Sequence, residues 1–426
     1  MGKDMFRAAM WLLALAVAGA VSVVAAAEGR LKIKNVSQLR VFEPHVDVNL
    51  KPRPIFEVNP VFIRSPARSV VVSTSYSWIC SYPERAAFSQ IISLRNSVCH
   101  LVSLPATISN MSAPLRANND DMWRRNYNGI VAATILDGSN VHPRIFFAVQ
   151  GENKNEIIGG QKIHNTVMDD DKSDCFSEAR NGAYFDCWKF YFSFVNAAIA
   201  TPSSDGSVSA ADMGPIIWPS AGYLRNGKRI SAGVRSPSLF SDSRWIYVFY
   251  NDTSSEKEQG RGGGLKVARA SASDQAPNFV PFFSGTFDVN NRSLPPNFDK
   301  KNIAKFLELS GGKADPLWSP ALQTTKFRVA KIKNSKFYIG VSESGGFNNM
   351  IWSLDLRLSP DLVHWSEPVR IPGATAADWK GGNLHYPDFY WDDVAAGGID
   401  IEAFSIIGNG GHGRIVKIDI SASLEN

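Results

Sequence analysis

The sequence predicts an all-β protein that folds as a single-domain five-bladed β-propeller with long loop insertions. Two observations predict this fold. A short pattern, in which a polar residue leads into an apolar strand and a second β-rich strand follows, returns five times along the chain. No sustained helical periodicity interrupts the repeats. A β-unit that recurs every ~70 to 110 residues is typical of a propeller, whose blades surround one central pocket.

The first strand of each repeat begins with a polar residue, which Pro follows in four of the five cases. These predicted first strands span residues 59–63, 128–131, 236–240, 319–322 and 386–390, and their partners span 70–73, 145–149, 245–250, 337–341 and 401–404. Their starts lie 69, 108, 83 and 67 residues apart. The longest interval indicates an insertion from Gly160 to Gly214.

Three further segments complete the predicted domain. Residues Gly29 to Glu43 alternate as an edge strand does, and they could complete the last blade and close the ring. A second insertion, Pro277 to Asp315, is rich in Pro, Asn, Gly and Phe and predicts a long loop on one face. The glycine-rich run from Gly260 to Gly264 predicts a hairpin turn. No Pro/Ser-rich linker divides the repeats, which favours one domain from residue 28 to residue 426.

The first 27 residues have the pattern of a secretory signal peptide. Lys3 and Arg7 form a basic start, an apolar stretch follows, and Ala25 to Ala27 provide small residues for cleavage. The alternative is an uncleaved N-terminal anchor. The signal predicts a secreted, periplasmic or extracellular protein, with no membrane span after cleavage.

The charge and composition exclude some partners and favour others. Removal of the signal lowers the formal charge from +5 to about +4, which is too weak to argue for nucleic acid. Aromatic residues make up 11% of the chain. Flat apolar rings suit contact with sugar faces, although core packing also uses them.

The four cysteines form two pairs that are local in sequence. In an exported chain this favours disulfides between Cys80 and Cys99 and between Cys175 and Cys187. Two other connectivities stay open. The cysteines have neither CxxC spacing nor a nearby His pair, so a zinc site is not expected.

No cofactor is expected from the motifs. The chain has no nucleophile elbow, Rossmann fingerprint or Walker loop. The acidic run from Asp169 to Asp174 could bind Ca²⁺ in a structural site, but it lacks the regular EF-hand spacing, and a solvated acidic loop is the simpler interpretation.

Two segments resemble a known superfamily. Residues Met350 to Ser366 contain the order Ser359, Asp361, Leu362 and Trp365 after an apolar strand, and residues Ser236 to Asp252 carry a related strand pair. These segments resemble the five-bladed glycoside hydrolases that include arabinanases, β-xylosidases, arabinofuranosidases, invertases and levansucrases. The resemblance implies a pocket in which paired carboxyl groups hydrolyse a glycosidic bond, one as acid and one as base or nucleophile.

The chain departs from the superfamily at the strand starts. An acidic residue commonly stands there in the superfamily, but these positions hold Asn59, Asn128, Ser236 and Ser319. An amide or hydroxyl cannot supply a proton at ordinary pH. Carboxylates instead follow three second strands, at Glu152, Asp252 and Glu343. Second strands return toward the face from which first strands leave, so we expect these ends to approach the pocket.

Six acidic residues fall near this face, and four of them are predicted to be catalytic. Glu152 is the expected general acid and Asp121 the base or nucleophile, with Glu343 and Asp252 as alternates; Asp315 and Asp388 complete the set. Each could also be an ordinary turn carboxylate. The predicted substrate-binding residues are Arg235, Trp318, His385, Asn128 and Asn153. His385 and Trp318 could equally be packing residues.

The sequence thus leads to two functional hypotheses. The first is an exported glycoside hydrolase that acts on a poly- or oligosaccharide without an organic cofactor. The alternative is a glycan-binding or polysaccharide-assembly protein that uses the same pocket without hydrolysis, because the fold by itself does not determine activity.

Overall fold

The computed structural model has an all-β fold, as predicted. The structure describes residues 29–42, 61–65, 68–72, 78–82, 98–103, 127–136, 144–153, 155–158, 161–164, 192–202, 208–220, 224–225, 228–229, 232–252, 264–274, 276–299, 306, 309–318, 323–346, 351–377, 384–390, 398–410 and 414–425. No α-helix occurs within these ranges. In the same ranges, no helical segment has the length and hydropathy that crossing a membrane requires.

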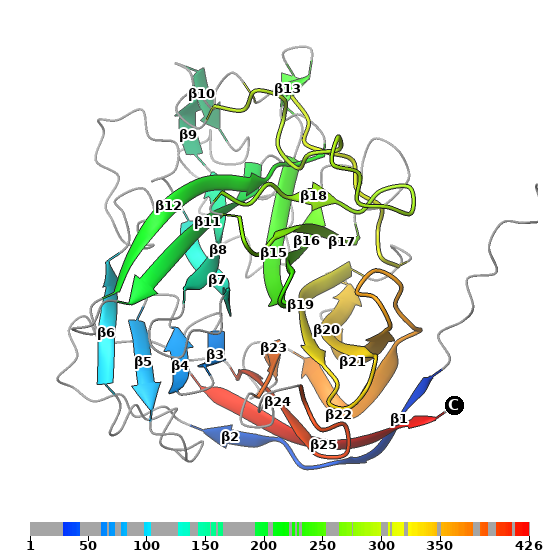
Figure 1. Ribbon diagram of the computed structural model, residues 1–426. Coiled ribbons are helices and arrows are strands. Elements are labelled where there is room, and N and C mark those ends of the chain that lie inside the picture. The colour runs from blue at the N-terminus through cyan, green and yellow to red at the C-terminus, as the bar shows by residue number, and fades with distance from the viewer. Residues whose placement is uncertain are drawn as a thin grey trace, which may run out of the picture.

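Within the described residues, the strands form five antiparallel series of four, which we call units 1 to 5 (Figure 1). Unit 1 comprises β3 (Val61–Ser65), β4 (Arg68–Val72), β5 (Trp78–Tyr82) and β6 (Val98–Ser103). Unit 2 comprises β7 (Tyr127–Ile135), β8 (Ile145–Asn153), β11 (Phe192–Pro202) and β12 (Val208–Ile217). Unit 3 comprises β15 (Ala232–Ser241), β16 (Trp245–Asp252), β17 (Leu265–Ser271) and β18 (Val280–Pro281).

Unit 4 comprises β19 (Gln323–Lys331), β20 (Tyr338–Gly346), β21 (Ile351–Ser359) and β22 (Val369–Ala377). Unit 5 comprises β23 (His385–Phe389), β24 (Phe404–Asn409), β25 (Ile415–Glu425) and β1 (Arg30–Val36). Two small hairpins lie outside the units: β9 (Asn155–Ile158) with β10 (Gln161–His164), and β13 (Leu224–Arg225) with β14 (Lys228–Arg229).

The first strands of the units, β3, β7, β15, β19 and β23, lie around the middle of the molecule (Figure 1). Each contacts the first strand of the next unit, from β3 to β7, β15, β19 and β23 in turn. Short parallel pairings, of β11 with β15 and of β12 with β6, also join units 1, 2 and 3 into one sheet. The arrangement is propeller-like, with consecutive first strands next to one another around the middle of the molecule.

The N-terminal segment completes unit 5. β1 pairs with β25 from Arg30 opposite Glu425 to Val36 opposite Ile420. β2 (Arg40–Phe42) pairs with an earlier part of β25. The predicted edge strand within Gly29 to Glu43 is therefore confirmed. Unit 5 combines strands from both ends of the described chain.

Four first strands carry a β-bulge near their start. The register shifts between Ile130 and Ala132 in β7, between Arg235 and Ser238 in β15, between Thr325 and Phe327 in β19, and between His385 and Asp388 in β23. Three of the bulges contain a non-glycine residue in the left-handed region, at φ 50° for Ser236, 48° for Lys326 and 53° for Tyr386. Such a conformation costs on the order of 1 to 2 kcal/mol per residue.

The bulges change the meaning of the polar-Pro pattern. Ser236-Pro237 and Tyr386-Pro387 lie inside β15 and β23, within the bulges, and not at turns before the strands. Proline has no N–H to donate to a strand ladder, so it is accommodated where the ladder is interrupted. In these two units, the polar residue followed by Pro therefore marks a bulge within the first strand and not the start of that strand.

Other predicted boundaries shift. Residues 319–322 lie outside the described residues, and the first strand of unit 4 begins at Gln323. The partner expected at 401–404 begins at Phe404. The expected insertion from Gly160 to Gly214 is wrong in its second half, because β11 and β12 are regular members of unit 2. The Asp169 to Asp174 run and residues 1–28 lie outside the described ranges.

The segment Pro277 to Asp315 is mostly irregular where it is described, as expected of a loop, but hydrogen bonds attach it to the sheets. Trp218 N–H donates to the Ser293 carbonyl at 3.2 Å, and Gly311 N–H donates to the Pro219 carbonyl at 2.8 Å. The Trp218 indole N–H donates to the Leu309 carbonyl at 3.1 Å. The loop is thereby held against the end of β12.

The motif that resembles the glycosidases forms the turn after β21. The Ser359 hydroxyl accepts the backbone N–H of Leu362 at 2.8 Å, and Asp361 Oδ1 accepts the N–H groups of Val363 and His364. The Trp365 indole donates to the Leu362 carbonyl at 3.0 Å. Serine and aspartate side chains stabilise turns in this way. The motif therefore has a structural role in unit 4.

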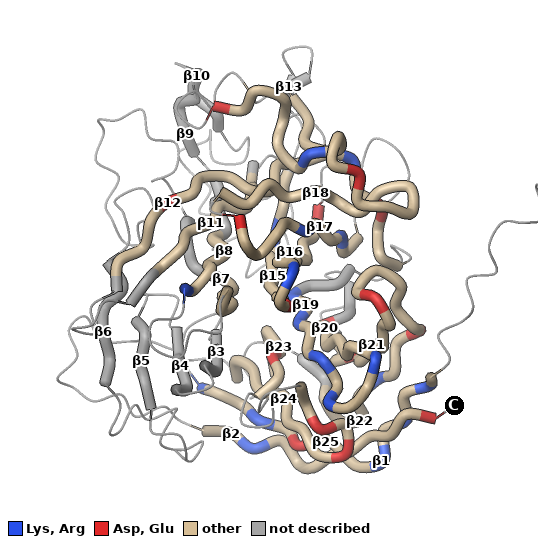
Figure 2. The backbone as a smooth tube through the Cα atoms, in the orientation of Figure 1, with Lys and Arg blue, Asp and Glu red and all other residues tan. Residues whose placement is uncertain are grey.

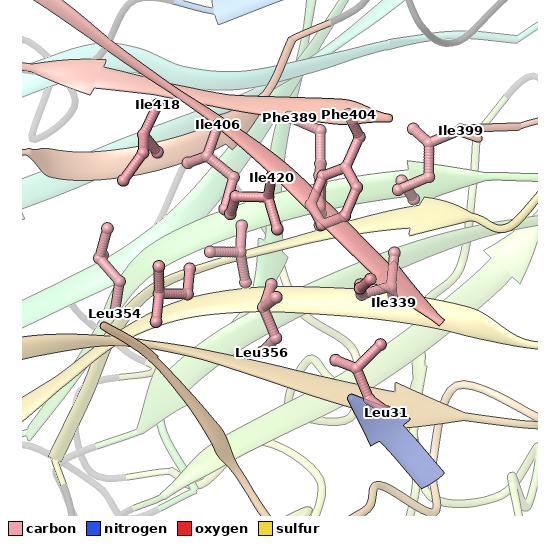
Figure 3. Close-up of a cluster of buried hydrophobic side chains, with 14 of the residues drawn as sticks. Leu31, Ile339, Leu354, Leu356, Phe389, Ile399, Phe404, Ile406, Ile418 and Ile420 are labelled. Carbon is pink, nitrogen blue, oxygen red and sulfur yellow. The ribbon is translucent and has the colours of Figure 1, made fainter. Parts of the chain in front are cut away.

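Hydrophobic faces of neighbouring units pack against each other. The largest of these clusters joins units 4 and 5 to β1, and Figure 3 shows side chains of Ile339, Leu356, Phe404 and Ile420 pointing toward one another. All four are at most 3% exposed. A second cluster joins units 2 and 3, and a third, rich in aromatic rings, joins units 3 and 4. The burial of apolar area between units provides the main favourable free energy of this fold.

Leu31 tests the contribution of the N-terminal strand. It is 5% exposed and packs in the cluster between units 4 and 5. We expect Leu31→Ala to lower the free energy of unfolding by about 2 to 4 kcal/mol, since it leaves a cavity. Urea denaturation measures this change. Arg30→Ala, at an exposed position of the same strand, should change it by less than about 0.5 kcal/mol; equal effects of the two substitutions would contradict the role of β1 in the core.

Candidate active site

Three second strands end next to the start of their own first strand. The register places Glu152 opposite Tyr127, Asp252 opposite Val234, and Glu343 opposite Thr325. These pairings confirm that the carboxylate positions of units 2, 3 and 4 lie at the end of the sheets where first strands begin. The four bulges lie near the same end, and bulges are frequent beside functional sites because they redirect side chains.

Glu343 reaches from unit 4 to unit 5. Its Oε1 lies 2.8 Å from Nδ1 of His385, the first residue of β23. Both side chains are buried, at 3% exposure for Glu343 and 5% for His385. A carboxylate in this position accepts a hydrogen bond from an imidazole protonated at Nδ1 and thereby orients the ring. The predicted residues Glu343 and His385 are thus brought together.

Asp388 and Arg328 form a second buried pair between the same two units, from β23 to β19. Arg328 Nε lies 3.3 Å from Asp388 Oδ2. The guanidinium also donates from Nη2 to the Val131 carbonyl at 2.8 Å and from Nη1 to the Pro237 carbonyl at 3.5 Å. Arg328 therefore contacts β7, β15 and β23 from its own position on β19. It joins the first strands of four units.

Burial and the neighbouring charge shift the pKa values of Asp388 and Arg328 in opposite directions. Desolvation raises the pKa of Asp388 to about 6, although Arg328 and the Phe389 N–H oppose the shift. Desolvation also lowers the pKa of the Arg328 guanidinium, against the attraction of Asp388. A carboxyl group with a pKa near 6 is partly protonated close to neutral pH. Such a group can donate a proton and take it back.

The bulge of β23 places His385 and Asp388 on one face. Side chains alternate along a strand, so residues three apart normally face opposite sides. Here the four residues of β23 from His385 to Asp388 lie opposite three of β24, from Asn409 to Ile407. The extra residue restores both side chains to the same face. One short strand thus presents Asp388 and the partner of Glu343 together.

Lys326 and Tyr386 occupy the left-handed positions of the bulges in β19 and β23. The Lys326 ammonium lies 4.8 Å from the centre of the Tyr386 ring, within the range of a cation–π contact. Lys326 is only 6% exposed. The Tyr386 ring also lies 6.4 Å, centre to centre, from the imidazole of His385. This cluster connects the basic residue of one unit to the Glu343–His385 pair.

The predicted residue Asp252 is in an ion pair. It is 1% exposed, lies 3.4 Å from the Lys266 ammonium, and accepts the backbone N–H of Ser220 at 3.0 Å. Lys266 belongs to β17, so this contact is made within unit 3. The environment favours a structural role for Asp252, and its catalytic role stays a prediction.

Arg235 and Trp318 lie in different surroundings. Arg235 is half-buried in β15, directly before the bulge residue Ser236. Trp318 packs by its edge against Phe327 and Trp365, and the Arg357 guanidinium lies 4.4 Å from its ring centre. Trp318 therefore belongs to the aromatic cluster between units 3 and 4. Asp315 accepts the Ser284 N–H at 2.6 Å within the loop.

Of the remaining predicted residues, some are described by their backbone positions alone and others lie outside the described residues. Asn128, Glu152 and Asn153 lie in β7 and β8, at the same end as the bulges. Asp121, Asn59, Cys175 and Cys187 lie outside the described residues. Cys80 and Cys99 are direct cross-strand partners in the register of β5 and β6. Within the described ranges, no group of three or more His, Cys, Asp or Glu side chains could hold a metal ion.

Lys326 and Arg328 are not among the site residues predicted from the sequence, and Asp388 has no predicted catalytic role. Figure 2 shows basic positions on β15 and β19 and an acidic position on β23 near the middle of the molecule. The spacing of the two basic residues is a signal that could have identified them. Lys326 and Arg328 are two positions apart in a segment that is otherwise apolar up to Lys331. A charged residue within a buried strand requires a partner.

Asp388 provides a test of this arrangement through pH. Its folded pKa, about 6, lies above its ordinary value of 3.8, so the folded protein binds this proton more tightly than the unfolded chain does. The contribution of Asp388 to the free energy of unfolding is therefore largest below pH 4 and falls as the pH rises to 6. We therefore compare the free energy of unfolding of Asp388→Asn with that of the unaltered protein. The difference, variant minus unaltered, should rise by roughly 2 to 3 kcal/mol from pH 4 to pH 7.

Urea denaturation at a series of pH values measures this difference. Asp274→Asn, at an exposed turn, is the control and should show little dependence on pH relative to the unaltered protein. A difference for Asp388→Asn that stays constant from pH 4 to pH 7 would show that Asp388 is not held as described.

Comparisons with known proteins find similarity in structure only. No protein-family model matches the chain. No curated protein matches it either. Among solved structures, the chain is similar to an exo-β-1,3-galactanase, described as putative, from Bifidobacterium bifidum s17, with 12% identity, TM-score 0.45, and coverage of 92% of this chain and 97% of that one. It is also similar to an α-L-arabinanase mutant from Cellvibrio cellulosa, with 12% identity, TM-score 0.40, and coverage of 85% and 91%.

A third similar structure is fructan 1-exohydrolase IIa from Cichorium intybus, with 15% identity and a TM-score of 0.31. The match covers 59% of this chain and only 33% of the exohydrolase, so the chain spans about a third of that protein. Arabinanases are among the enzymes that the two sequence segments resemble.

Proposed function

We propose that this protein is a carbohydrate-active enzyme, a glycoside hydrolase that cleaves a poly- or oligosaccharide where the first strands begin. The observation that carries the proposal is that β23 joins two buried carboxyl groups in different environments. Glu343 is bound by His385, and Asp388, on the same face of that strand, has a pKa raised to about 6. Glycoside hydrolysis requires one carboxyl group that donates a proton and one that is ionised.

The environments suggest distinct roles. Asp388 is the group that can hold a proton near neutral pH and transfer it to the leaving oxygen, because desolvation opposes its ionisation. Glu343 accepts a hydrogen bond from the imidazole when it is ionised, which suits a base or nucleophile. His385 acts as a positioning residue for Glu343. Arg328 limits how far the pKa of Asp388 can rise.

Glu152 and Asp121 remain candidates for the same two roles. The backbone register places Glu152 beside the start of β7, at the same end as Glu343. Asp121 precedes that strand in sequence. We propose that the catalytic pair comes from these four carboxyl groups, and that Arg235, Asn128 and Asn153 bind sugar hydroxyls around it.

A second candidate function is glycan binding without hydrolysis. Asn128 lies in β7 next to its start and Ser236 in the bulge of β15, positions near those where the superfamily commonly has acids. Amides and hydroxyls bind sugar hydroxyl groups but do not transfer protons at ordinary pH. This arrangement would suit a protein that holds or assembles a polysaccharide.

We propose that the five units are the blades of a single five-bladed propeller, with the pocket on its axis. Each unit is a four-stranded antiparallel series, and consecutive first strands are in contact. The contact of Arg328 with three other units supports a common axis. We also propose that the protein is exported after removal of residues 1–27, as the basic start and apolar stretch indicate.

A reducing-sugar release screen tests the enzymatic proposal. We expect turnover of at least one glycan, and we expect Glu343→Gln and Asp388→Asn to lower kcat by about 10² to 10⁴-fold, the usual contribution of a proton-transferring group. Glu152→Gln and Asp121→Asn belong in the same assay. Glu367→Gln, at an exposed turn, is the control and should keep full activity.

The outcomes separate the candidates. Unchanged turnover in a variant removes that residue from the catalytic pair. Glycan binding by the unaltered protein with no turnover on any glycan would contradict hydrolysis and support the binding function.

The disulfide prediction is tested by peptide mapping of the exported protein without reduction. Cys80 and Cys99 are opposite each other in β5 and β6, and cross-strand neighbours have the Cα spacing that a disulfide requires. We expect a Cys80–Cys99 linked peptide that disappears after reduction, with a stabilisation of about 2 to 4 kcal/mol. A peptide that links Cys80 to Cys175 or Cys187 would exclude this pairing.

A further inference from the structure

Three first strands place a strained residue at equivalent positions. Ser236, Lys326 and Tyr386 have φ values of 50°, 48° and 53°, and each lies in the bulge of its strand. Glycine would adopt this conformation without a steric cost. The chain instead has a hydroxyl, an ammonium and a phenol at the three positions. Backbone strain of this kind gathers where side chains are needed in a particular direction.

Two of these side chains form a charged and aromatic pair beside the carboxyl groups. The Lys326 ammonium lies 4.8 Å from the Tyr386 ring centre, and Tyr386 directly follows His385, which binds Glu343. Register also places Thr325, the residue before Lys326, opposite Glu343. Lys326 is therefore next to the proposed catalytic region both through the chain and through the contact with Tyr386.

A second cation lies near the bulge of the neighbouring unit. Arg235 is half-buried and directly precedes Ser236 in β15. The first strands β15 and β19 are in contact with each other. Cationic side chains on two adjacent first strands, near the bulges, create a region of positive potential that favours an anionic group on a ligand. A phenol ring beside them offers a flat face for a sugar ring.

We propose that Lys326 and Tyr386, with Ser236 and Arg235 from the neighbouring unit, form a subsite for a sugar that carries an anionic group, a carboxylate or a sulfate ester. This inference rests on the proposed function, since it assigns the substrate class of the same site. Lys326 determines specificity by binding the anionic group. Tyr386 supports the sugar ring, and the strained backbone directs both side chains.

Binding of monosaccharides by the intact protein tests this proposal without requiring turnover. The probes are glucuronate against glucose, galacturonate against galactose, and galactose 6-sulfate against galactose, each measured by ligand-observed NMR titration. We expect tighter binding of at least one anionic sugar than of its neutral counterpart, by about tenfold or more. The pair that shows the difference identifies the anionic group as carboxylate or sulfate.

The variant Lys326→Met should abolish that preference and leave the affinity for the neutral sugar within about twofold. Lys326→Arg, which keeps the charge, should retain most of it. Lys331→Met is a matched control, because the Lys331 ammonium lies 4.1 Å from the Tyr338 ring at the other end of the same strand. It should not alter any of the affinities.

A third variant distinguishes the loss of the anionic preference from a folding defect. Lys326→Gly removes the backbone strain, so its melting temperature should be at least that of the unaltered protein while the anionic preference is lost. Equal affinities for anionic and neutral sugars in the unaltered protein, or a preference that survives in both Lys326→Met and Lys326→Gly, would overturn the proposal. If the preference is present but no glycan is hydrolysed, the subsite is supported and the hydrolase function fails.

Discussion

The middle of the molecule depends on the contacts that the buried guanidinium of Arg328 makes. From β19 it reaches carbonyl oxygens of Val131 and Pro237 and the carboxyl group of Asp388, so it connects four units at once. A buried cation without partners is very costly, and each of these units must therefore stay at hydrogen-bond distance from it. The same contact limits the pKa of Asp388, which links the assembly of the units to the protonation of this carboxyl group.

The bulges show that the arrangement of side chains at this point of the fold has a cost in backbone strain. Regular alternation would place His385 and Asp388 on opposite faces of β23, and the extra residue in the strand brings them to the same face. The local cost is a left-handed backbone at Tyr386, and Lys326 and Ser236 adopt the same conformation. The hydrophobic clusters between units supply the free energy that tolerates this strain.

Local sequence patterns predicted what depends on local chemistry. The apolar strands, the closing strand near Leu31 and the return of Glu343 to the start of its unit all follow from period-two patterns and antiparallel pairing. Arg328 could not be recognised in this way, because its partners at positions 131, 237 and 388 come from three distant repeats. The bulge at Ser236-Pro237 was misread as a strand start for a similar reason: proline marks an interruption but does not say whether it lies before a strand or within one.

Pairing of β1 with β25 has a consequence for how the chain reaches this fold. Partners such as Leu31 and Leu424 are separated by almost the entire polypeptide, so closing this contact carries a large loop entropy and must follow the arrangement of the intervening units. During synthesis, unit 5 stays incomplete until β25 leaves the ribosome, and the edge of β24 is exposed meanwhile. Late closure of this kind leaves unpaired strand edges, which are sites of aggregation, until β25 pairs with β1 and β24.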